Sequence, residues 1–148
     1  MAIRLKNLDL RTDGMTRHAN VSLGDVSATR NDFVFVAPMA CVVNYVDLYS
    51  NQANPPAGTT ASTTNISATL VAVINNTATT MTSRGTSATA INTDSISANA
   101  RWRLTPSAGN SLTQGTPVRI QFTVAASGVL SGVLVDVTYT PLVHRETR

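Results

Sequence analysis

The sequence predicts an all-β protein, built as an antiparallel β-sandwich or jelly roll. Helix-favouring surface residues are scarce, because Lys and Glu each occur once in the 148 residues, at Lys6 and Glu146. β-Branched residues dominate instead, and several short runs alternate between apolar and polar side chains with a period of two. About seven or eight short strands of this kind are typical of two sheets packed face to face.

The alternation is clearest in residues 117–125, where apolar residues occupy every even-numbered position. Residues 66–74 turn apolar on both faces at one end, so this strand is expected to be buried on both sides. The other expected strands are residues 33–36, 41–49, 101–104 and 132–140. Polar connections rich in Thr, Ser, Asn, Gly and Pro are expected at residues 51–65, 75–86 and 105–116.

Residues 1–32 differ from the rest of the chain, because their apolar residues are weakly spaced and Gly14 and Gly24 interrupt them. We expect these residues to form an extended N-terminal arm, followed by a β-sandwich domain at residues 33–148. An alternative is that residues 17–25 are the first strand of the same domain.

Charge is sparse and unevenly placed along the chain. Only 13% of the residues are charged, the net charge is +3, and basic residues gather near both termini. Arg4, Lys6, Arg11 and Arg17 make the expected arm basic, which favours contact with an acidic protein surface. Direct binding of nucleic acid is not expected, because aspartates interleave with these residues and no aromatic stacking platform accompanies them.

Residue types that carry catalytic or metal chemistry are rare. Residues 48–93 include a single charged residue, and the two histidines, His18 and His144, lack metal-ligand spacing. We therefore expect neither an enzyme nor a metal or other cofactor. Cys41 lies in an apolar run, which indicates a small buried core residue. No run approaches the roughly 18 apolar residues of a membrane helix, so no membrane partner is expected.

The sequence offers two further candidates for a contact surface. Arg101 and Arg103 are expected to face outward and, with Arg119, to form a cationic patch for a carboxylate-bearing protein surface. A solvated sheet face is the equal alternative. Trp102 alternates with two of these arginines and is expected in the core, whereas an exposed Trp102 or Tyr49 would serve as a platform for sugar.

Residues 33–49 (FVFVAPMACVVNYVDLY) and 66–76 (ISATLVAVINN) resemble small jelly-roll head proteins of tailed bacteriophages. In those proteins a hydrophobic strand, an Ala-Pro turn and a second strand precede a Thr/Ser-rich loop and a further strand. Residues 128–141 resemble their closing strand, so the resemblance covers residues 33–141. It implies a decoration, or cement, protein on the outside of an icosahedral capsid, often a trimer whose arm reaches over neighbouring capsid subunits.

We therefore expect a non-enzymatic capsid decoration protein, located on the capsid surface of the virion and assembled in the host cytoplasm. Its expected partners are the major capsid protein, contacted by the basic arm, and further copies of the chain, with a trimer favoured. Val71, Val73 and Leu134 are expected to be buried between protomers. The alternative is a fibre or tail head domain that binds a host glycan or receptor, and a structural tail or baseplate subunit is a third reading.

Overall fold

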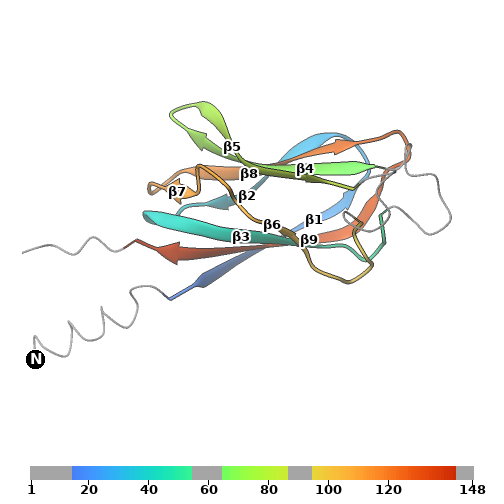
Figure 1. Cartoon of the computed structure of the whole chain (residues 1–148), viewed down its shortest axis with the longest axis horizontal. Coiled ribbons are helices and arrows are strands. Elements are labelled where there is room, and N and C mark those ends of the chain that lie inside the picture. Colours follow the sequence, from blue (N-terminus) through green and yellow to red (C-terminus); the bar gives the residue numbers. More distant parts are fainter. Residues whose placement is uncertain (1–14, 55–64, 87–94, 143–148) are drawn as a thin grey trace, which may run out of the picture.

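The computed structural model describes residues 15–54, 65–86 and 95–142. Within these ranges the chain forms nine strands and no helix, which confirms the all-β prediction. The strands are β1 (Arg17–Val26), β2 (Arg30–Val36), β3 (Cys41–Tyr49), β4 (Ile66–Ile74), β5 (Thr77–Gly85), β6 (Trp102–Leu104), β7 (Ser111–Leu112), β8 (Pro117–Val124) and β9 (Leu130–Pro141). Figure 1 shows them stacked in two layers.

The strands pair into two antiparallel sheets whose order is that of a jelly roll. Sheet A has the order β1-β9-β3-β6, with β7 also paired to β3, and sheet B has the order β2-β8-β4-β5. β6 and β7 pair with opposite ends of β3, at Leu48 and Cys41, so together they fill the place of one edge strand. The chain crosses between the sheets six times, between strands 1 and 2, 2 and 3, 3 and 4, 5 and 6, 7 and 8, and 8 and 9. This winding makes a double Greek key.

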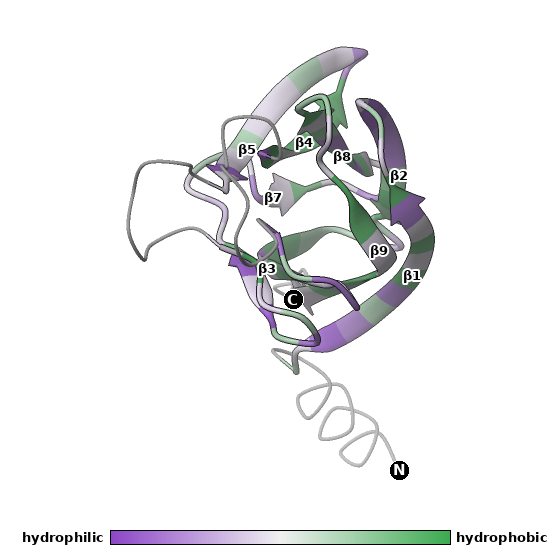
Figure 2. Cartoon of the chain, turned by 90° about the vertical axis from the view of Figure 1, so that its right-hand side faces the viewer, coloured by the Kyte–Doolittle hydropathy of each residue, from purple (hydrophilic) through white to green (hydrophobic). Residues whose placement is uncertain are grey.

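The core lies between the two sheets and is filled by the apolar side of each alternating strand. In β8 the even-numbered residues from Val118 to Phe122 are buried, as the period of two predicts. Cys41 and Trp102 both belong to this core, which confirms two predictions. Figure 2, a view along the sandwich, shows the two sheets facing each other, with hydrophobic stretches in strands of both. Each large core side chain stabilises the fold by about 1.5–3 kcal/mol relative to an exposed position.

The structure corrects the expected extent of the N-terminal arm. β1 pairs with β9 from Arg17 to Val26, and β2 pairs with β8 from Arg30 onward. Val26 is fully buried, so residues 17–32 belong to the sandwich rather than to an arm. The alternative, in which residues 17–25 form the first strand of the same domain, is the one that the structure supports. The remainder of the expected arm, residues 1–14, lies outside the described residues.

The connection expected at residues 75–86 is also corrected, because most of it is β5. β4 and β5 are joined by the two residues Asn75 and Asn76, whose φ angles are 50° and 60°. Positive φ at both positions defines a type I′ hairpin turn, in which asparagine is one of the favoured residues. Only Met81 of β5 is buried, so the strand gives almost no apolar alternation in the sequence.

Both described ends of the chain lie at the same end of the sandwich, because β1 begins opposite the last residues of β9. Met15 and Leu142 are exposed there. Val36 is exposed at this end as well, since the turn after it leads directly to Cys41, which pairs with Pro141. We call this the terminal end, defined by Met15, Val36 and Leu142.

Candidate functional site

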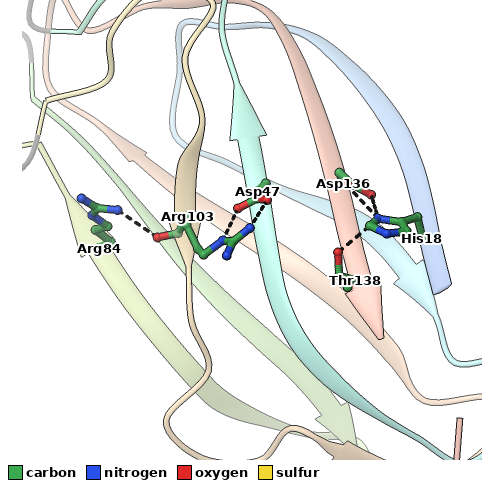
Figure 3. Close-up of polar contacts among 6 residues, drawn as sticks. All are labelled: His18, Asp47, Arg84, Arg103, Asp136 and Thr138. Atoms are coloured by element: carbon green, nitrogen blue, oxygen red, sulfur yellow. Dashed lines mark hydrogen bonds and ion pairs between the residues drawn. The ribbon is translucent and has the colours of Figure 1, made fainter. Parts of the chain in front are cut away.

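The outward face of sheet A carries a row of charged side chains (Figure 3). Asp136 of β9 and Asp47 of β3 are direct cross-strand partners, and Arg103 of β6 is the next partner in the row. His18 of β1 lies beside Asp136 at the other end of the row. Like charges directly opposite each other destabilise a sheet, so the two carboxylates each need a cation.

Arg103 holds Asp47 in a two-pronged ion pair. Its Nε donates to Oδ1 and its Nη2 donates to Oδ2, both at 2.8 Å. The Asp47 side chain is 4% exposed and the Arg103 side chain is 32% exposed, so the carboxylate is buried while the guanidinium meets solvent. The guanidinium also lies 3.5 Å from the centre of the Tyr45 ring, which is a cation–π contact. The hydrogen bonds to Asp47 raise the pKa of Arg103 and keep it charged.

His18 and Asp136 form a looser pair. The Nδ1 atom of His18 lies 3.2 Å and 3.1 Å from the two carboxylate oxygens and 3.2 Å from Oγ1 of Thr138. The His18 side chain is 52% exposed, and exposed ion pairs stabilise a fold by no more than about 1 kcal/mol. Each aspartate of the row thus has its own partner inside the chain, and the row joins four of the five strands of sheet A, namely β1, β9, β3 and β6.

Arg84 of β5 connects the end of this row to the other sheet. Its Nη1 donates to the Arg103 carbonyl oxygen at 2.9 Å, and its guanidinium lies 5.4 Å from the centre of the Trp102 ring. Trp102 is 2% exposed, so it serves as a core residue and not as a surface for sugar. Tyr49 is half-buried at the end of β3.

The outward face of sheet B has a different chemistry. Its residues are Asn31, Phe33 and Val36 of β2; Pro117, Arg119, Gln121 and Thr123 of β8; Ser67, Thr69, Val71 and Val73 of β4; and Ala78, Thr80 and Ser83 of β5. Arg119 is the one charged side chain in this set. Phe33, its cross-strand partner on the edge strand, is 62% exposed, and Val36 nearby is 57% exposed. Val71, the partner of Arg119 on β4, is already buried within the chain, so it is not free to pack between protomers.

The three arginines of the expected cationic patch do not lie together. Arg103 faces outward from sheet A and is occupied by Asp47, whereas Arg119 faces outward from sheet B on the opposite side of the sandwich. Arg101 is exposed immediately before β6. Of the basic residues expected in the arm, Arg17 is exposed at the start of β1. The others, Arg4, Lys6 and Arg11, lie outside the described residues.

A shallow hollow adjoins the face of sheet B at the terminal end. It is lined by residues 73–76 and 113–117 and has a volume of about 280 Å³. This is below the roughly 300–1,000 Å³ of typical small-molecule pockets. In the described ranges, no three His, Cys, Asp or Glu side chains gather in a way that would hold a metal ion. The same part of the chain contains no helix long and apolar enough to cross a membrane.

Sequence reasoning missed the most exposed apolar side chains of sheet B. The sequence analysis predicts only that Phe33 belongs to a strand. The neighbouring Asn31 and Asp32 indicate that this is an edge strand with one solvent-exposed face. It also missed the Asp47–Arg103 pair, because the two residues are far apart in the sequence and meet only through the register of β3 with β6.

Comparison with solved structures finds viral capsid proteins at low similarity. A chain of the cyanophage Pam1 capsid asymmetric unit is 21% identical, with 88% of this chain and 87% of that chain covered and a TM-score of 0.41. The structure of infectious bursal disease virus, Gt strain, matches at 9% identity and a TM-score of 0.36, with 88% of this chain and 38% of that chain covered. No protein-family model matches the sequence, and no curated protein matches it. The assignment of a jelly roll rests on the strand order itself.

Proposed function

We propose that the chain is a structural protein of a virion, a decoration or cement protein that binds the outside of an icosahedral capsid and stabilises its lattice. The observation that carries the proposal is the terminal end of the sandwich. There the exposed side chains of Met15, Val36 and Leu142 lie beside both described ends of the chain, and the sequence beyond each of these ends is basic. The sequence resemblance to jelly-roll head proteins of tailed phages supports the same function.

In this proposal the domain sits on the capsid and its basic N-terminal segment contacts the major capsid protein. Arg4, Lys6 and Arg11 precede the sandwich, and Arg17 is exposed where β1 begins. Together they would meet acidic groups of the capsid lattice. Contacts with several capsid subunits at once raise the avidity without any single strong contact. Because the protein binds the assembled lattice and not free subunits, it stabilises the shell by mass action.

The partners in this proposal are the major capsid protein and further copies of the chain, with a trimer favoured. The protein is made in the host cytoplasm and resides on the capsid surface. It acts by binding and carries no catalytic activity. The alternative, a fibre or tail head domain for a host glycan or receptor, loses its main candidate residue because Trp102 is buried.

Cosedimentation with expanded, undecorated capsids tests the proposal, with the mass of the free protein measured in parallel. Saturable binding at a fixed ratio to the capsid protein is the expected result. Absence of binding by a folded protein would reject the capsid role and direct attention to the fibre or tail alternative.

A truncation tests the role of the basic segment. Removal of residues 1–14 leaves every described strand intact, because β1 begins at Arg17. We expect the truncated protein to keep its thermal midpoint and to lose capsid binding. A variant in which Arg4, Lys6 and Arg11 become Gln is the matched control for charge alone, and its binding is expected to weaken and to lose its salt dependence. Undiminished binding by the truncated protein would exclude this segment as the contact.

A further inference from the structure

Among the cationic side chains that the structure describes, Arg119 has a buried nitrogen without a hydrogen-bond partner, its Nε. None of the ion pairs found among the described residues involves it. A buried donor without an acceptor costs a fold about 1–3 kcal/mol, so such a group in a native chain needs an explanation.

The surroundings of Arg119 resemble the centre of a protein interface. Phe33 on one side is largely exposed although it is a large apolar residue, and Val36 extends the apolar surface toward the terminal end. The rest of the face is neutral, with hydroxyl and amide side chains such as Thr69 and Gln121. Interface centres are depleted in charge and enriched in aromatic residues and arginine, and a few such residues supply most of the binding energy.

The acceptor for Arg119 is not found on the described surface of a second copy, because each carboxylate there is already bonded within its own chain. Asp25 accepts from Gly132 and Ser131, and Asp32 accepts from Arg30. Asp47 and Asp136 are held in the row on sheet A. The chain also carries a net charge of +3, which favours an acidic partner over a copy of itself.

We propose that the outward face of sheet B around Phe33 and Arg119 docks a foreign protein segment that presents a carboxylate beside apolar side chains. The carboxylate accepts from the terminal Nη groups of Arg119, because Nε itself is buried, and the apolar side chains cover Phe33 and Val36. This assignment rests on the proposed function, in which the partner is the capsid lattice, and it adds a contact made by the folded domain to the contact made by the basic segment.

Substitution on the intact protein tests the assignment. Arg119→Met keeps an apolar stem and removes the donors, and we expect it to weaken binding to undecorated capsids about 30-fold, the loss typical of an interface hot spot. Phe33→Ser is expected to weaken binding about 10-fold or more. Arg101→Met is the matched control, because this arginine is exposed beside the other sheet, and its affinity is expected to stay within about twofold of the wild type. Thermal midpoints close to that of the wild type verify that all three variants fold.

The outcomes separate this inference from the proposed function. If the wild type binds and Arg119→Met binds equally well, the docking face is refuted while the capsid role stands. If the wild type does not bind, the capsid role and the docking assignment fall together. A change in the mass of the free protein on Phe33→Ser or Arg119→Met, with capsid affinity unchanged, would identify a second copy as the occupant and overturn the foreign partner.

Discussion

Replacing Arg103 with methionine gives a sharp test of the row of charges on sheet A. The change keeps an unbranched side chain over Tyr45 and removes both hydrogen bonds to Asp47. The Asp47 carboxylate then stays buried on the sheet without its cation. We expect a clear loss of stability, and its size follows from the exposure of the two partners.

Breaking a fully buried ion pair by removing one partner costs about 3–5 kcal/mol. Arg103 is 32% exposed, however, so water reaches the site and replaces part of the lost interaction. We reduce the expected loss to about 2 kcal/mol for this reason. In a protein of this size, 1 kcal/mol corresponds to about 2–4 °C in the thermal midpoint, so Arg103→Met should unfold about 4–8 °C earlier.

His18→Ala is the control on the same face. The pair between His18 and Asp136 is exposed, so His18→Ala should lower the free energy of unfolding by less than about 1 kcal/mol. Thermal and urea unfolding at neutral pH measure both variants. Equal effects for Arg103→Met and His18→Ala would refute the view that burial of the carboxylate sets the cost.

A double variant isolates the pair from its surroundings. With Asp47→Leu and Arg103→Met together, no unpaired charge remains, and an apolar replacement of a buried ion pair is often neutral or stabilising. The double variant should therefore be more stable than Arg103→Met alone. A loss equal to the sum of the two single losses would show that the two charges are not coupled.

Three further predictions concern stability and accessibility. Gly132→Ala and Gly24→Ala should each cost about 1 kcal/mol in urea unfolding, because φ is 58° and 67° at these positions; the Asn51 amide lies where the new Cβ at position 132 would be, but this exposed side chain can rotate away, so a much larger loss at Gly132 than at Gly24 would contradict the reasoning. Burial raises the pKa of the Cys41 thiol, so a thiol reagent should label it only as the protein unfolds, and rapid labelling of the native protein would contradict its place in the core. Hydrogen bonds from Gly132 and Ser131 lower the pKa of Asp25, so its contribution to stability is complete above about pH 4 and is lost as the pH falls further. In Asp25→Asn the free energy of unfolding should therefore depend less on pH below about pH 4, and the same pH dependence as in the wild type would exclude the effect.

The strands that the sequence predicts are those with one fully buried face. In β8 from Val118 to Phe122, and in β9 from Val133 to Tyr139, every second residue enters the core, so the period of two is visible. β5 was not recognised and β1 was given only as an alternative to an arm, because both strands lie at sheet edges and bury few side chains. In β1 the register also shifts around Gly24, which breaks the alternation that would have revealed the strand.

The charged row and the docking face depend on which strands become neighbours, and a strand's own residues do not specify this. Arg103 and Arg119 look alike in the sequence, since each is an outward arginine between apolar neighbours. The winding of the jelly roll places them on opposite sides of the molecule. The pairing of Asp47 with Arg103 depends in addition on the irregularity between Val43 and Tyr45 in β3, because a shift of one residue turns a side chain to the other face.

The contrast between the two outward faces indicates how the domain would sit on a partner. Burying the face of sheet A would desolvate Asp47, Asp136 and the side chains bonded to them, which already have partners and would gain few new interactions. Burying the face of sheet B covers exposed apolar surface at Phe33 and supplies an acceptor for Arg119. The new apolar contact and hydrogen bond therefore offset the cost of desolvating this face. Sheet B should therefore face the partner and sheet A should face solvent, with the exposed apolar side chains of the terminal end beside the contact.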